Sequence, residues 1–81
     1  MEEIIKNKLT LKQGEVLKLI DHRMKGSLQE TDVYNYDIVD ESGLKVGSVE
    51  YTHHTAIKGF KVTQTMTQKT LDGEIVNNER W

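Results

Sequence analysis

Histidine is the residue type in this sequence best suited to bind a metal ion or to act as a general base, because the chain contains no cysteine. The three histidines are His22, His53 and His54. Neighbouring residues of a strand point to opposite faces, so His53 and His54 can share one ion only if they lie in a loop. His22 and an acid such as Glu50 would then complete a site of nitrogen and oxygen ligands. The spacing matches no established metal motif, so we expect solvated loop histidines and no cofactor.

Carboxylates and glycines indicate no catalytic site. Asp37, Asp40 and Glu41 cluster at a predicted hairpin, where acidic residues are common. A glycosidase-like or proton-transfer role for these acids would need two of them to face each other across a cleft, which a single thin sheet seldom forms. Gly43 and Gly47 fit neither a phosphate-binding loop nor a dinucleotide-binding fingerprint. We therefore expect no enzymatic activity.

Aromatic residues and threonines are the candidates for an interface. Tyr34 and Tyr36 share one face of a predicted strand, as stacking residues of single-strand nucleic-acid binders do, but the surrounding acids would repel phosphates. Six of the eight threonines lie between residues 52 and 70, where they would form a solvated sheet face or a recognition surface. If their strand is an edge, it could accept a partner strand. Trp81 would pin the last strand or act as an interface anchor. The interface candidates are Tyr34, Tyr36, Thr63, Thr65, Thr67 and Trp81.

Charge is spread unevenly along the 81 residues, whose formal net charge is -2. Residues 1–26 carry +2, residues 27–51 carry -5 and residues 52–81 carry +1. A nucleic-acid-binding protein normally shows a basic stripe, so the acidic middle favours a protein partner or self-association. Binding to nucleic acid is the alternative, and it would use a basic N-terminal segment. The residues of that segment are Lys6, Lys8, Lys12, Lys18, Arg23 and Lys25.

Length and composition predict one small domain, residues 1–81, in the cytoplasm. The absence of cysteine excludes a disulfide framework and favours a reducing compartment. Unbroken apolar runs reach only two residues, so we expect no membrane-spanning segment and no signal peptide.

From residue 30 onward, the alternation of apolar and polar residues predicts an antiparallel meander. Asp40 and Gly43 favour one turn, residues 53–59 form a loop, and Asp72 with Gly73 is typical of a hairpin. Gly47 indicates a bulge or a close backbone approach. The four predicted strands cover residues 32–40, 44–52, 60–69 and 75–81. The third of these strands begins at Phe60.

Residues 8–25 fit either a helix or two strands. In a helix, Thr10 would be the N-cap and Gly26 the C-terminal stop, with an apolar stripe of Val16, Leu17, Ile20 and Met24. In the alternative, residues 8–12 and 16–24 would be strands joined by a turn at residues 13–15. Gly14 suits the turn, whereas it would cost about 0.8–1 kcal/mol relative to alanine inside a helix.

The sheet itself favours the helix, because four strands leave an apolar face bare unless another element covers it or the sheet rolls up. We therefore expect an α+β fold, with an N-terminal amphipathic helix packed on a four-stranded antiparallel β-meander. An all-β small roll or barrel is the alternative. The expected function is that of a small soluble non-enzymatic binding module, a protein-interaction or regulatory domain, with a homodimer as its simplest form. Nucleic-acid binding and a His-based metal-binding protein remain the alternatives.

Overall fold

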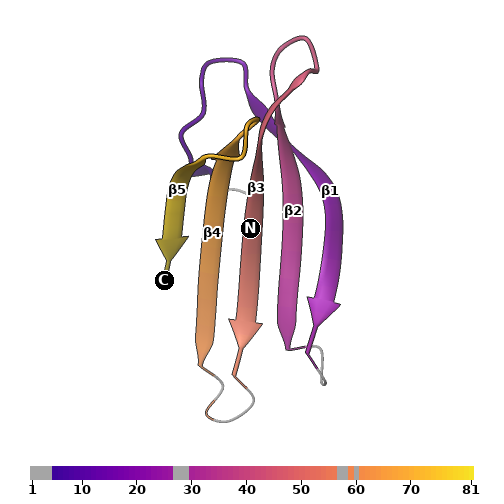
Figure 1. Ribbon diagram of the computed structural model, residues 1–81. Coiled ribbons are helices and arrows are strands. Elements are labelled where there is room, and N and C mark those ends of the chain that lie inside the picture. Colours follow the sequence, from indigo (N-terminus) through magenta and orange to yellow (C-terminus); the bar gives the residue numbers. More distant parts are fainter. Residues whose placement is uncertain (1–4, 27–29, 57–58, 60) are drawn as a thin grey trace.

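The chain forms one antiparallel sheet of five strands in a computed structural model, which describes residues 5–26, 30–56, 59 and 61–81. The strand order follows the sequence, so each strand pairs with its neighbours along the chain (Figure 1). The expected four-strand meander therefore has a fifth strand at its N-terminal side. The strands are β1 (Val16–Lys25), β2 (Thr31–Val39), β3 (Lys45–Thr55), β4 (Val62–Thr70) and β5 (Ile75–Arg80).

The predicted N-terminal helix is wrong, and with it the α+β class, because residues 16–25 form the edge strand β1. Gly14 has a φ of +85°, a left-handed conformation that ends any helix and that glycine adopts without strain. The apolar spacing imitates a helix because the pairing register of β1 shifts between Leu19 and Asp21, which breaks the alternation of a regular strand. The all-β alternative fits. Among the described residues, only residues 5–6 have helical backbone.

The predicted turns after β2 and β4 are confirmed. Asp40 Oδ1 accepts hydrogen bonds from the backbone N–H groups of Ser42, at 2.8 Å, and Leu44, at 3.0 Å. Gly73 lies between β4 and β5 with a φ of +90°. A side chain at Gly47 would place its Cβ 2.7 Å from the Lys69 carbonyl oxygen, and the β2–β3 register shifts beside it. Gly47 thus marks both a close approach and a bulge.

The loop predicted at residues 53–59 starts later than expected, because β3 continues to Thr55. His53 and His54 therefore belong to a strand, where successive side chains alternate between the two faces. Phe60, predicted at the start of the next strand, lies outside the described residues.

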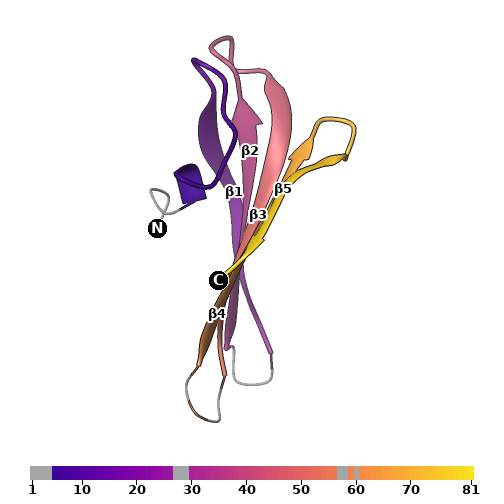
Figure 2. The same cartoon turned by 90° about the vertical axis from the view of Figure 1, so that its left-hand side faces the viewer.

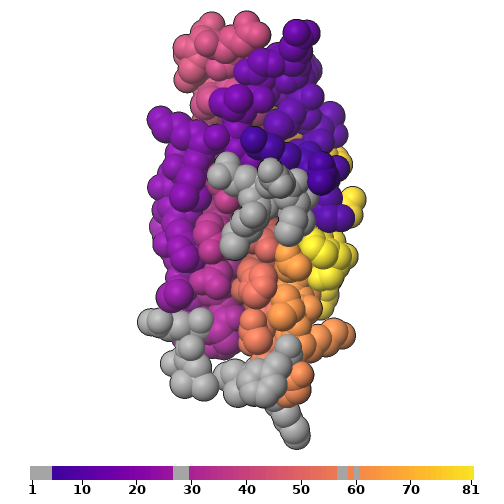
Figure 3. Space-filling view, turned by 180° about the vertical axis from the view of Figure 1, so that it is seen from behind, coloured from indigo at the N-terminus to yellow at the C-terminus, as the bar shows by residue number. Residues whose placement is uncertain are grey.

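The two faces of the sheet have different surroundings. The N-terminal segment, residues 5–15, lies over one of them, which we call the covered face (Figures 2 and 3). Ile5 enters the core there, and Leu9 and Leu11 pack against it. The other face, which we call the open face, has no described segment over it (Figure 2). The core cluster consists of Ile5, Tyr36, Ile38, Val49, Tyr51 and Met66.

Gln68 connects the N-terminal segment to the sheet through hydrogen bonds. Its side chain is only 4% exposed, so its amide needs partners within the protein. The Thr10 backbone N–H donates to Gln68 Oε1 at 2.9 Å, and Gln68 Nε2 donates to the Thr10 carbonyl oxygen at 2.8 Å. Asn77 Nδ2 adds bonds to Thr10 Oγ1 at 3.1 Å and to Gln68 Oε1 at 2.8 Å. This network fixes the segment that completes the core.

Within the part of the chain that the structure describes, no helix has the length and apolar character needed to cross a membrane.

Candidate binding groove on the open sheet face

The pairing register arranges the side chains of the open face in rows that cross the strands. Residues paired across antiparallel strands point to the same side, so each row can be followed from one edge to the other. The first row contains Lys18, Asp37, Ser48, Lys69 and Ile75. The second row contains Asp21, Asn35, Glu50, Thr67 and Asn78, and the third contains Arg23, Val33, Thr52, Thr65 and Arg80.

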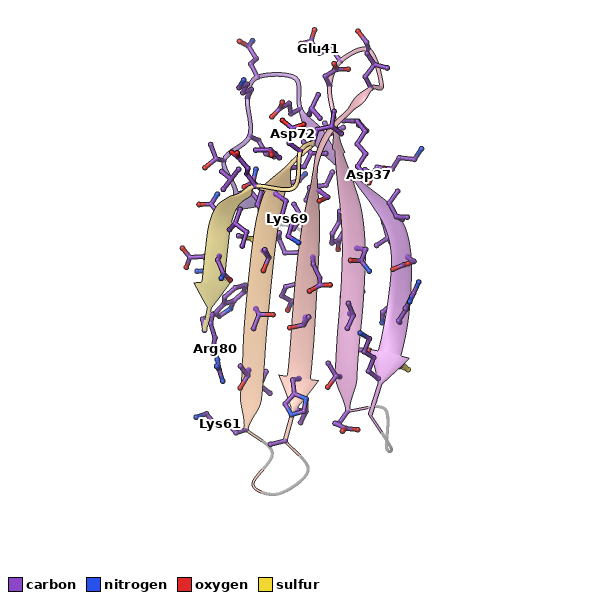
Figure 4. All side chains as sticks on the ribbon, viewed as in Figure 1. Asp37, Glu41, Lys61, Lys69, Asp72 and Arg80 are labelled. Carbon is purple, nitrogen blue, oxygen red and sulfur yellow. The ribbon has the colours of Figure 1, made fainter. Side chains whose placement is uncertain are left out.

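A groove of about 440 Å³ lies over the first two rows. Ile20 from β1 and Ile75 from β5 border it, so side chains from all five strands take part. Figure 4 looks onto this face and shows Asp37 and Lys69 on the strands that flank β3. Between the two apolar borders, the lining side chains that belong to the open face are polar or charged, namely Asn35, Asp37, Lys45, Ser48, Glu50, Thr67, Lys69 and Asn78.

The groove presents both signs of charge. Lys45 Nζ lies 3.3 Å from Asp37 Oδ1, and both residues of this ion pair line the groove. Lys69 and Glu50 are exposed, in neighbouring rows and on adjacent strands. A second polar link joins Asn35 Nδ2 to Asp21 Oδ1 at 2.8 Å. Such a lining can form ion pairs and hydrogen bonds with acidic, basic and amide groups of a partner.

The three predicted threonines lie on the open face in a line along β4. Thr67 lines the groove, whereas Thr65 and Thr63 extend away from it in the following rows. The Thr65 hydroxyl is hydrogen-bonded to the Thr52 hydroxyl. β4 lies between β3 and β5, so it is not the sheet edge that would accept a partner strand.

The predicted aromatic candidates lie on the covered face instead. Tyr36 belongs to the core, while Tyr34 and Trp81 flank Tyr51 with ring centres 5.8 and 6.1 Å from its ring. Lys8 Nζ lies 4.6 Å from the centre of the Trp81 ring. The six interface candidates are thus divided between two faces and cannot form one surface.

Tyr51 is the buried centre of this row of rings. Burial, and after it the charges of Tyr34 and Asp32, raises the pKa of its hydroxyl above the ordinary value. The hydroxyl donates a hydrogen bond of 2.6 Å to Gln64 Oε1, which requires the protonated form. Tyr51 therefore acts as a structural residue of the covered face.

The structure does not bring the three histidines together. His22 stacks on Tyr34 at 4.2 Å and donates to Asp32 Oδ1 at 3.0 Å on the covered face. His54, on the open face, is hydrogen-bonded to Thr31 through Nδ1 at 2.6 Å, and His53 points to the opposite side. Among the described residues, no group of three or more histidines and acids is placed to hold a metal ion.

The six basic residues of the N-terminal part form no continuous stripe. Lys6, Lys8 and Lys12 belong to the segment associated with the covered face, whereas Lys18, Arg23 and Lys25 point to the open face. Two of the latter have acidic neighbours: Lys18 pairs across the strands with Asp37, and Arg23 lies 3.3 Å from Asp21.

Most groove residues were not among the sequence-based candidates. The alternation did place Asn35 and Asp37 on one face of their strand, and Thr67 with Lys69 on one face of another. The missing information was the register, which sets Ser48 between Asp37 and Lys69 and makes one row of them.

Comparison with protein-family models found no match, and comparisons with curated proteins and with solved structures found no similar chain.

Proposed function

We propose that this protein is a small, non-enzymatic, cytoplasmic module that binds another protein through the groove on its open sheet face. The observation that carries the proposal is the groove itself, which draws side chains from all five strands while the core is completed on the opposite face. A surface without a packing role is available to a partner.

The lining indicates the chemistry of the partner. Asp37 and Glu50 would repel a phosphate backbone, so the mixed charges favour a polypeptide over a nucleic acid. A polypeptide supplies acidic, basic and amide groups to this lining, and apolar side chains to the borders at Ile20 and Ile75. We expect the partner to bind with a segment that has polar residues at its centre and apolar residues at its sides.

Affinity purification with a matched pair of variants tests this function. Lys69→Glu reverses a charge inside the groove, whereas Lys61→Glu makes the same change at an exposed position outside it (Figure 4). We expect the wild-type protein and Lys61→Glu to retain the same protein from a host lysate, and Lys69→Glu to lose it. Equal capture by all three proteins would contradict the groove as the binding surface.

Nuclease treatment of the same lysate separates the nucleic-acid alternative. Capture that survives the nuclease supports a protein partner, whereas capture that disappears supports nucleic-acid binding. In the latter case, binding should also weaken steeply as salt is added, because phosphate contacts release counterions.

A further inference from the structure

β1 is a long and exposed edge of the sheet. It has ten residues and pairs with β2 on one side, and no described residue pairs with its other side. The opposite edge strand, β5, has six residues and is polar beyond its first two. Unpaired strand edges accept other strands, and proteins that stay monomeric usually shorten or cover them, bend them with a bulge or line them with charged side chains. Four apolar side chains of β1 are about half exposed: Val16 (52%), Leu19 (53%), Ile20 (51%) and Met24 (56%).

The register shift in β1 limits how a second copy of this strand can pair with it. Because the alternation is interrupted between Leu19 and Asp21, two consecutive residues, Ile20 and Asp21, take part in the open face. Antiparallel pairing brings residues of the same face together, since paired side chains point to the same side.

A two-fold axis between Ile20 and Asp21 satisfies this condition for every pair along β1. If the second strand is shifted by one residue, residues away from the axis, such as Leu19 and Asp21, pair although they point to opposite faces. If it is shifted by two residues, the pair at the axis joins residues of opposite faces, such as Leu19 with Ile20. The bulge therefore selects one register. Its pairs are Ile20 with Asp21, Leu19 with His22, Lys18 with Arg23, Leu17 with Met24 and Val16 with Lys25, each occurring twice.

The charges of β1 are compatible with this register. Lys18 would face Arg23 of the second copy, and like charges in that position weaken pairing. Arg23 has an acidic neighbour, since it lies 3.3 Å from Asp21, and Lys18 pairs across the strands with Asp37, which also forms an ion pair with Lys45. These acids reduce the repulsion that two bare cations would create.

We propose that a second copy of this chain binds antiparallel along β1, about a two-fold axis between Ile20 and Asp21. The two sheets then continue into one sheet of ten strands, with both open faces on the same side. Ile20, which borders the groove, lies near the axis in each copy and stands between the two grooves. The dimer concerns the strand edge and is independent of what occupies the grooves.

Pairs of introduced cysteines test the register, because the chain has no cysteine of its own. In Lys18→Cys with Arg23→Cys, the new thiols face each other across the axis at a Cα separation that a disulfide can bridge. The same two positions within one copy are roughly 16 Å apart along the strand, so they cannot bridge internally. We expect a covalent dimer on mild oxidation with oxidised glutathione, detected by intact mass and by electrophoresis without reductant.

The matched control is Lys18→Cys with Lys25→Cys. In the proposed register these positions are offset by two residues, which adds roughly 7 Å along the strand and exceeds the reach of a disulfide. We expect it to remain mostly monomeric under the same conditions. Equal cross-linking of both variants, or cross-linking of the control alone, would overturn the register.

Sedimentation equilibrium of the wild-type protein at micromolar concentration tests the dimer itself. We expect a dimer for the wild type and a monomer for Ile20→Glu, whose carboxylate would face Asp21 of the second copy, with circular dichroism confirming that the variant is folded. Lys18→Thr serves if Ile20→Glu fails to fold: it removes the like-charge pair and should tighten the dimer by about two- to tenfold. A monomeric wild type would overturn the proposal. Weaker association of Lys18→Thr would also overturn it and indicate an acidic partner strand at this edge.

Discussion

The two faces of this sheet are built from alternate residues of the same strands, yet they differ in almost every physical property. On β4, Met66 is fully buried in the core of the covered face, while its neighbours Thr65 and Thr67 remain partly exposed on the open face. The covered face holds the aromatic rings and the network around Gln68. The open face holds ion pairs, hydroxyl groups and the groove.

This difference shows how a short chain can form a core and keep a surface for binding. One face and the N-terminal segment supply most of the apolar burial, and of the side chains in the three rows of the open face only Val33 is buried, so this face is under less constraint from packing. Stability and binding should therefore respond to different substitutions, even between adjacent residues. The following predictions test that separation.

The largest difference is expected between Met66 and Thr65. Met66→Ala should lower the free energy of unfolding by about 2–5 kcal/mol, because it leaves a cavity in the core. Thr65→Ala changes the next residue, on the open face, and should cost about 1 kcal/mol or less, since it loses mainly the bond to Thr52. Urea unfolding of both variants measures the contrast, and similar losses would contradict the separation of the faces.

A smaller effect is expected at Gln68. Gln68→Leu keeps the buried volume similar but leaves the N–H and C=O groups of Thr10 without their partner. We expect a loss of about 1–3 kcal/mol, together with faster hydrogen exchange in residues 5–15. The control is Thr67→Val on the open face, which should stay within about 0.5 kcal/mol of the wild type. Unchanged exchange in the N-terminal segment of Gln68→Leu would show that this network does not hold it.

The pH dependence of the free energy of unfolding tests the structural role of Tyr51 on the covered face. Its pKa is raised in the folded protein, chiefly by burial, so the unfolded chain releases this proton first as the pH rises past about 10. The free energy of unfolding should therefore fall above pH 10, until the folded protein releases the proton as well. Tyr51→Phe should lose about 0.5–1.5 kcal/mol at neutral pH with the bond to Gln64, and show a flatter decline above pH 10. Parallel declines in the two proteins would exclude this role.

The smallest change in stability is expected for Lys69→Glu. Lys69 is exposed, so the reversal should alter the free energy of unfolding by no more than about 0.5 kcal/mol. The same variant should lose the captured partner, which would separate binding from stability. A large loss of stability, measured by thermal or urea unfolding, would show that this groove residue also contributes to the stability of the fold.

Sequence patterns were reliable where the strands are regular. The alternation of Tyr34, Tyr36 and Ile38 and the turn around Asp40 follow from local rules, and both agree with the structure. The N-terminal prediction failed at β1, where the bulge between Leu19 and Asp21 produces apolar spacing typical of a helix. Gly14 carried the correct signal, because its positive φ belongs to the turn before β1, although residues 8–12 of the strand alternative form no strand.

The candidate site was harder to predict than the fold, because it depends on register. Ser48 joins Asp37 and Lys69 only after two strand pairings are known, and no local pattern specifies both. The covering of one face by residues 5–15 also decided which side chains are buried. Tyr34 and Trp81 looked suited to an interface, but they pack around Tyr51 on the covered face.

Side-chain methyl spectra of the protein, recorded with and without the captured partner, test the central claim most directly. Ile20, Ile75 and Thr67 report on the groove, whereas Ile38 and Met66 report on the core of the covered face. We predict that binding shifts the methyl signals of the groove residues and leaves those of Ile38 and Met66 largely unchanged. Shifts at Ile38 and Met66 with unchanged groove signals would contradict the assignment of binding to the open face.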